Sequence, residues 1–259
     1  KDPKKLYSIK KSVSLMIEIC GDKSVDLYNL SDIKKFQNYF VNINKISTGK
    51  RNQSNIQNLF SIILDKYSVE KKNPFSGLKW PFYKKSTIHQ SFSTQELNEI
   101  KDFCSKEKTL ISLVIGMIFD TGCSYNEIIG LANEDISINQ YTPYIIIRSN
   151  KYREIRNIYK KRVIPLVGLS METIHKINMS EMEELLFKKY FEVNNINKIY
   201  LEKKINNQIR FFNKDMTCIS FKYSLIERLR SINCPDGIIC DLVGLAKRES
   251  FYNDEVSLD

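Results

Sequence analysis

The sequence has few of the residues that build metal and redox sites. Its 259 residues include two histidines and six cysteines, and no two cysteines are spaced as a C-x-x-C pair. Structural zinc sites commonly draw their ligands from closely spaced pairs, so the spacing speaks against zinc. We therefore expect no metal and no cofactor. We interpret the cysteines as reduced, buried thiols of a cytosolic protein.

Long apolar runs are also missing. No segment reaches the ~18 consecutive apolar residues of a transmembrane helix, so we expect no membrane span. Disorder is disfavoured too, because 42% of the residues are hydrophobic and can form real cores. A chain of 259 residues has room for one large domain or two ordinary ones.

Positive charge is abundant and unevenly placed. The net charge is +10. Residues 1–85 contain 17 lysines and arginines against seven acidic residues and so carry the whole excess, while residues 86–259 are balanced. A basic region of this kind is typical of proteins that bind a polyanion, most simply nucleic acid. The alternative is a basic domain with no such partner, since Lys-rich surfaces are common.

Residues 1–79 are predicted to form a helical domain. Apolar residues recur at helical spacing in three segments, and Ser31 is the expected N-cap of the second segment, 30–43. The cluster NPFSGLKWP at 73–81 combines several helix breakers and ends this region. We expect a linker over residues 80–92, which are polar, basic and without a helical period.

Residues 93–259 are predicted to form a second, mostly helical domain with a small β-hairpin. Ser93 and Glu96 have the spacing of a capping box, which predicts that a helix begins there. Ile145–Ile147 and the segment KRVIPL at 161–166 are the expected strands. The predicted fold class is therefore mainly α with a small sheet.

The densest basic run of the chain lies between the two expected strands. Residues 148–162 hold seven lysines and arginines against Glu154 alone. Such side chains would contact phosphates, which sets affinity and register but not sequence. A solvated basic surface is the alternative. The expected nucleic-acid contacts are Lys50, Arg51, Lys71, Lys72, Lys84, Lys85, Arg148, Lys151, Arg153, Arg156, Lys160, Lys161 and Arg162.

Six short motifs follow one another along nearly the whole chain. They are NPFSGL at 73–78, SFSTQELNEI at 91–100, TGCSYNEIIGLANEDI at 121–136, PYIIIRSN…KKRVIPL at 143–166, ISFKYSLIERLRSINCP at 219–235 and LVGL at 242–245. In order and spacing they resemble the tyrosine recombinase, or phage integrase, family. The resemblance implies a SAM-like helical core-binding domain over 1–79 and a catalytic-type domain over 93–259. In that family the two domains clamp duplex DNA.

The resemblance also implies a set of reactive positions. In the family two arginines hold the scissile phosphate, a lysine and histidines move protons, and a tyrosine attacks phosphorus to form a 3′-phosphotyrosine link. In this chain these functions fall on Ser124, Arg156, Ile219, Lys222, Leu245 and Tyr252.

Most of these positions carry a residue that cannot perform the family's chemistry. Ser124 stands for the first arginine and offers one neutral hydroxyl in place of a planar fork of donors. Lys222 stands for the second arginine; it keeps the charge, so it is also an expected DNA contact, but it loses the fork. Ile219 and Leu245 stand for histidines and have no proton to give.

Two positions stay open on the sequence alone. The hairpin lysine falls on Arg156, with Lys151 as the neighbouring alternative, and an arginine is a poor proton donor. The family's spacing places the nucleophile on Asp254, and Tyr252 lies two residues earlier. Tyr252 is either the aligned tyrosine, reached by a shorter loop, or an ordinary surface tyrosine.

The substitutions predict a DNA-binding protein of the recombinase family that has lost strand cleavage. Two alternatives stay open: an active site-specific integrase that uses Tyr252 in an atypical site, and a fold reused for protein interaction or regulation. The expected partner is duplex DNA, either alone or within a homo-oligomer or a complex with a recombinase partner on DNA. The expected location is the cytoplasm, on the nucleoid.

Overall fold

The described residues of the computed structural model are 3–77, 79–80, 90–138, 141–177, 185–188 and 197–246. The chain divides into two compact units, Lys1–Thr87 and Ile88–Asp259. The predicted linker over 80–92 spans this boundary, and most of it lies outside the described residues, so the bounds of the linker stay a prediction.

The first unit is built on three helices. They are α1 (Pro3–Cys20), α2 (Leu30–Asn42) and α3 (Ile46–Lys66), with a short 3₁₀ turn at Val25–Leu27. Aromatic side chains fill the space between them, among them Phe36, Phe40 and Phe60. The helices α2 and α3 approach closely at Gly49, where a Cβ atom would lie 2.7 Å from the Phe40 ring. This unit is helical, as the sequence predicted.

The start of α2 differs from the prediction. Asn29 is the N-cap: its side-chain oxygen accepts a hydrogen bond from the Ser31 N–H at 2.8 Å. The Asp32 carboxylate returns the contact by accepting from the Asn29 N–H at 3.0 Å. Ser31 therefore lies inside the first turn, and the prediction of Ser31 as the cap is wrong, because the Asn29–Asp32 pair forms a complete capping box.

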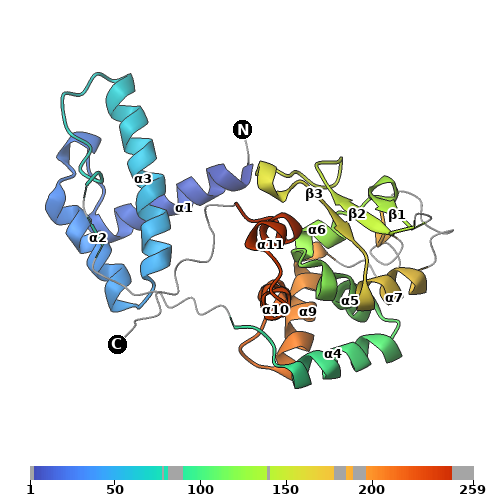
Figure 1. Ribbon diagram of the computed structural model, residues 1–259. Helices are drawn as coiled ribbons and strands as arrows, with labels where there is room; N and C mark the ends of the chain where they lie inside the picture. The colour runs from blue at the N-terminus through green and yellow to red at the C-terminus, as the bar shows by residue number, and fades with distance from the viewer. Residues whose placement is uncertain are drawn as a thin grey trace. The chain divides into compact units, whose positions relative to one another are not determined.

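The second unit is arranged around the apolar helix α5 (Leu110–Thr121), most of whose residues are buried. Figure 1 shows α4 on one side of α5 and the strands on the other. The predicted box at the start of α4 is confirmed, because the Ser93 hydroxyl and the Glu96 carboxylate each accept the other's backbone N–H. In the described part of this unit the other helices are α4 (Thr94–Lys106), α6 (Tyr125–Ile129), α7 (Gly168–Lys176), α9 (Lys198–Phe212), α10 (Cys218–Ser231) and α11 (Asp236–Val243).

Three short antiparallel strands form the sheet of the second unit, in the order β1 (Ile136–Ser137), β2 (Tyr144–Ile147), β3 (Arg162–Pro165). The predicted hairpin is confirmed as β2 and β3, and β1 adds a third strand. In the register, Ile145 faces Ile164 and Ile147 faces Arg162. The three isoleucines are buried. Because side chains alternate along a strand, Arg162 points to the same interior face as Ile164.

The architecture is mainly α with a small sheet, as the sequence predicted. All six cysteines are free thiols, and five of them are buried. Burial raises the pKa of Cys104 to about 12 and that of Cys123 to about 11, so both thiols stay protonated at neutral pH. In the described part of the chain, no helix combines the length and the apolar character that crossing a membrane requires.

Candidate nucleic-acid interface

Ser124 is the N-cap of α6 and lies two residues after the left-handed Gly122 that ends α5. Its hydroxyl donates to Glu127 Oε2 at 2.9 Å, and its backbone N–H donates to the same oxygen at 2.7 Å. The hydroxyl is therefore committed to the Glu127 carboxylate. Ser124 supports the turn between α5 and α6, and its single donor is not available to a phosphate.

A guanidinium does reach this place, but it comes from another part of the chain. Arg162 Nη1 donates to Glu127 Oε1 at 2.8 Å, and Arg162 Nε donates to the Leu242 carbonyl at 2.8 Å. The Arg162 and Glu127 side chains are both almost completely buried. Arg162 thus joins β3 to α6 and to the end of α11. The sequence analysis counted Arg162 among the basic residues of the hairpin and missed this role. The signal was its position two residues before Ile164 in the predicted strand, which places both side chains on one face.

The charge of Glu127 is held by these neighbours. Burial raises the pKa of the Glu127 carboxyl, but the hydrogen bonds and charge of Arg162 and the hydrogen bonds from Ser124 outweigh it. The pKa therefore lies below the ordinary value of a glutamate, and the side chain is ionised at neutral pH. Glu127 and Arg162 form a buried, fully charged ion pair.

Lys222 on α10 is half-buried and lies close enough to this pair for both of its charges to act on the Lys222 ammonium group. Burial, followed by the positive charge of Arg162, lowers the pKa of its ammonium group. Lys160 acts in the same direction and Glu127 opposes it. Among the described residues, Lys222 has no hydrogen bond and no ion pair. One carboxylate thus stands against three cations, and the local excess of positive charge favours an anion beside Lys222.

Gly244, which follows α11, permits the close approach of Arg162. Its φ is +70°, and a Cβ atom there would lie 2.9 Å from Arg162 Nη1. We expect Gly244→Ala to destabilise the fold by about 1–3 kcal/mol, because it adds backbone strain and crowds the guanidinium. Gly237→Ala is the matched control, since Gly237 lies in α11 with nothing within 4 Å of its Cβ position. Urea unfolding of both variants measures the difference; equal stabilities would contradict the prediction.

The other aligned positions lie as follows. Ile219 is exposed on the first turn of α10, and Leu245 packs against the small apolar cluster between α10 and α11. Arg156 is exposed and makes two 3.0 Å hydrogen bonds to Glu154. Tyr252 lies outside the described residues. The structure thus gathers Ser124 and Lys222 around the Glu127–Arg162 pair.

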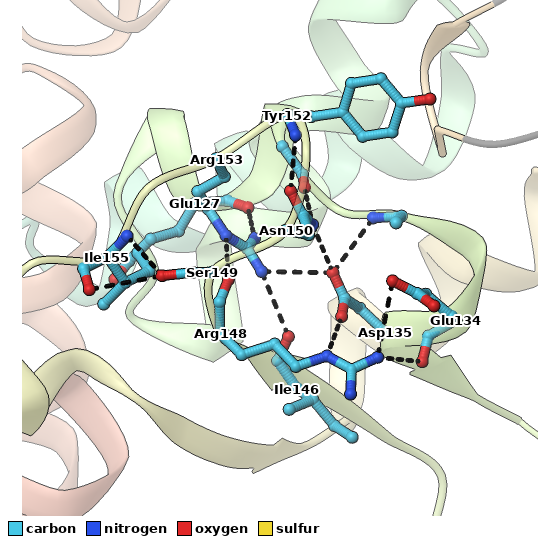
Figure 2. A network of polar contacts seen from close by, with 12 residues as sticks. Glu127, Glu134, Asp135, Ile146, Arg148, Ser149, Asn150, Tyr152, Arg153 and Ile155 are labelled. Carbon is cyan, nitrogen blue, oxygen red and sulfur yellow. Dashed lines mark hydrogen bonds and ion pairs between the residues drawn. The ribbon is translucent and has the colours of Figure 1, made fainter.

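The connection between β2 and β3 is anchored by Asp135, whose side chain is fully buried (Figure 2). Its carboxylate accepts from Arg148 Nε at 2.7 Å, from Asn150 Nδ2 at 2.8 Å and from Arg153 Nη2 at 3.3 Å. Arg153 also donates to the backbone carbonyl of Glu127 at 2.5 Å. These contacts hold the first residues of the basic connection, 148–153, against the turn after α6.

Part of the predicted set of phosphate contacts has its side chains inside the protein. The side chains of Arg153 and Arg162 are buried and paired with carboxylates, and their contact to a phosphate stays a prediction. Arg148 is half-exposed but tied to Asp135. The sequence pattern counted these arginines as surface charge because it could not show their distant partners.

Other members of the predicted set are exposed in both units. In the second unit they are Lys151, Arg156, Lys160 and Lys161, which lie in the connection between β2 and β3. In the first unit they are Lys50, Arg51, Lys71 and Lys72. Lys71 also donates to the Tyr28 carbonyl at 3.0 Å. Lys84 and Lys85 lie outside the described residues.

The sequence matches no protein-family model and no curated protein. Solved integrase structures resemble the chain throughout its length. A fragment of the Tn1549 transposon integrase in complex with transposon right end DNA has a TM-score of 0.71 at 14% identity, over 95% of this chain and 86% of that one. A lambda integrase fragment, a dimer bound to a COC′ core site, has a TM-score of 0.70 at 15% identity, over 100% and 91%. A lambda integrase tetramer bound to a Holliday junction has a TM-score of 0.65 at 14% identity, over 95% of this chain and 70% of that one.

At sequence identities this low, the structural similarity establishes the fold alone. The chain has the fold of the tyrosine recombinases, which confirms the fold predicted from the six sequence motifs.

Proposed function

We propose that this protein binds duplex DNA with the tyrosine recombinase fold and does not cleave it. The observation that carries the proposal is the cluster around Glu127, in which the half-buried Lys222 has no ion-pair partner among the described residues. The DNA complexes of the structurally similar integrases support the same partner. A backbone phosphate is the anion that this cluster would accept.

The same cluster argues against phosphoryl transfer. Catalysis in this fold needs donors that are free to hold the developing charge, and Ser124 and Arg162 are both committed to Glu127. Ile219 and Leu245 supply no titratable proton. Of the described positions aligned with the family's two phosphate-holding arginines, Lys222 keeps a positive charge, but one point charge cannot replace a bidentate guanidinium.

One observation favours a second candidate, an integrase with an atypical site. The pKa of Lys222 is lowered by burial and by Arg162, and a lysine of this kind is a better proton donor at neutral pH than an ordinary one. In that case Tyr252 would be the nucleophile and Lys222 the acid. Formation of a covalent protein–DNA adduct separates the two candidates.

DNA binding should be strongly salt-dependent. Each phosphate neutralised on duplex DNA adds about −0.9 to the slope of log K against log salt concentration. If Lys160 and Lys161 each contact a phosphate, the variant Lys160→Gln/Lys161→Gln should have a slope shallower by about 1.8. Fluorescence anisotropy with a random-sequence duplex over a series of NaCl concentrations measures the slope.

The matched control is Lys101→Gln/Lys106→Gln. Both lysines are exposed on α4, on the opposite side of α5 from the sheet (Figure 1), so their loss should leave the slope unchanged. A slope near zero for the unmodified protein, or no duplex binding at low salt, would overturn the proposed function. Equal slopes for both double variants would show that Lys160 and Lys161, in the β2–β3 connection, do not contact the DNA.

A further inference from the structure

Two apolar side chains stand exposed in the middle of the basic connection. Ile158 is 71% exposed and Tyr159 is 54% exposed, at the 3₁₀ turn Ile158–Lys160 that precedes β3. Neither belongs to the apolar core of the second unit. Placing two large apolar groups in water has a cost, and a contact that covers them would recover it.

The turn that carries this pair is well defined. Asn157 Oδ1 accepts from the Tyr159 N–H at 3.0 Å, and the N–H groups of Lys160 and Lys161 donate to the carbonyls of Asn157 and Ile158 at 3.1 Å and 3.0 Å. The pair therefore sits on a formed turn and would lose little conformational freedom when it docks.

Both ends of the connection are anchored as well. On one side, Ser149 Oγ accepts from the Ile155 N–H at 3.0 Å, and its chain neighbours Arg148 and Asn150 bond to Asp135 (Figure 2). On the other side, Arg162 is held by Glu127 at 2.8 Å. Between these anchors the chain displays Ile158 and Tyr159 outward.

The charges around the pair indicate what covers it. Lys160 and Lys161 follow Tyr159 directly, and Arg156 precedes the turn, with Glu154 as the one acidic residue between 148 and 162. Protein–protein interfaces are depleted in lysine. Apolar side chains flanked by cations are instead typical of proteins that bind the minor groove and wedge between base steps.

We propose that Ile158 and Tyr159 form an apolar wedge that enters the minor groove of duplex DNA and partly unstacks one base step. Lys160 and Lys161 hold the adjacent phosphates, and the duplex bends away from the wedge. This inference rests on the proposed function, and it adds the mode of contact and a deformation of the DNA.

The chain contains a matched control for this pair. Ile199 and Tyr200, at the start of α9, are 75% and 52% exposed. They also follow an asparagine cap, since Asn197 Oδ1 accepts from the Ile199 N–H at 2.9 Å. The two pairs thus share residue types, exposure and capping, and differ in position.

The test compares Ile158→Ala/Tyr159→Ala with Ile199→Ala/Tyr200→Ala. The probes are random-sequence duplexes of about 30 base pairs, labelled at both ends for energy transfer or carrying 2-aminopurine within TA steps, which unstack readily. The unmodified protein should bend the duplex by roughly 20–90° and raise the 2-aminopurine signal. The Ile158/Tyr159 variant should lose both effects and bind about tenfold more weakly, in line with the ~1–3 kcal/mol measured per base–aromatic contact. The Ile199/Tyr200 variant should match the unmodified protein.

Each other outcome has a distinct meaning. If the Ile158/Tyr159 variant still bends and unstacks the duplex, the wedge is overturned and the proposed function stands. If the unmodified protein binds no duplex at low salt, both the proposed function and the wedge are wrong. If the variant changes the sedimentation coefficient and leaves bending intact, the pair is a contact between copies of the chain, which also overturns the wedge. Circular dichroism of both variants checks that the fold is retained.

Discussion

Glu127→Gln should lower the free energy of unfolding by about 3–5 kcal/mol, the range for removing one partner of a buried ion pair. The Glu127 carboxylate receives Arg162 at 2.8 Å and the Ser124 N–H at 2.7 Å, and both side chains of the ion pair are almost completely buried. Glutamine keeps the shape but removes the charge, so the buried guanidinium of Arg162 loses its neutralising partner. Urea unfolding followed by circular dichroism measures the loss.

Two further variants show whether charge is the cause. Ser124→Ala removes only the hydroxyl that donates to Glu127 and should cost about 1.5–3 kcal/mol, the range for a hydrogen bond to a charged group. The double variant Glu127→Leu/Arg162→Met removes both charges and should recover most of the stability lost in Glu127→Gln, because an apolar pair of similar volume carries no desolvation penalty. A loss below ~1 kcal/mol in Glu127→Gln would show that the ion pair contributes little.

The same pair predicts a dependence on pH. The pKa of Glu127 in the folded protein lies below its ordinary value of 4.5. Its contribution to stability is therefore fully present above about pH 4.5 and is lost as the pH falls from there through the lower, folded pKa. Glu127→Gln should unfold with a shallower dependence on pH in this acidic window, as thermal melts between about pH 3 and 6 would show.

The parts of the fold that the sequence predicted are those fixed by neighbours in the chain. The Ser93–Glu96 capping box and the strand KRVIPL depend on spacings of a few residues, and both are present. The predicted cap of α2 was wrong, although it also depends on residues close in the chain. Asn29 and Ser31 are both good caps, and the side chain of Asp32 decides between them.

The candidate site depends on contacts between distant segments, and the sequence could not show them. Arg162 bonds to the Leu242 carbonyl, 80 residues away, and Arg153 to Asp135, 18 residues away. A basic run in a sequence counts these arginines as surface charge. The strand register directs Arg162 to the same face as Ile164, and the bonds to Glu127 and Leu242 place its guanidinium inside the protein.

The arrangement also bears on the expected effect of an arginine at position 124. In this structure the carboxylate of Glu127 is already shared by Ser124 and Arg162. A Ser124→Arg variant would place a second guanidinium beside Arg162, with one carboxylate for two cations. The histidine positions would still carry Ile219 and Leu245. We therefore expect Ser124→Arg to strengthen the positive charge of the site and to leave cleavage absent.

Incubation with a suicide DNA substrate should leave no covalent adduct. Losing one preorganised donor costs about 10²–10³ in rate, and losing acid–base catalysis costs ~10²–10⁴ more, so the product is on the order of 10⁴–10⁷. A nicked duplex that traps any 3′-phosphotyrosine product, analysed on a denaturing gel over hours, would detect residual activity. The unmodified protein and Tyr252→Phe should behave alike.

The decisive comparison is between the unmodified protein and a variant in which the site is rebuilt. The variant combines Ser124→Arg, Ile219→His, Lys222→Arg and Leu245→His, together with Arg162→Met to free Glu127. An adduct that forms only in the rebuilt variant, and disappears when Tyr252→Phe is added, would assign the loss of cleavage to these positions and the nucleophile to Tyr252. An adduct formed by the unmodified protein and abolished by Tyr252→Phe would instead establish an active integrase, and Lys222, whose pKa is lowered by burial and by Arg162, would be its acid.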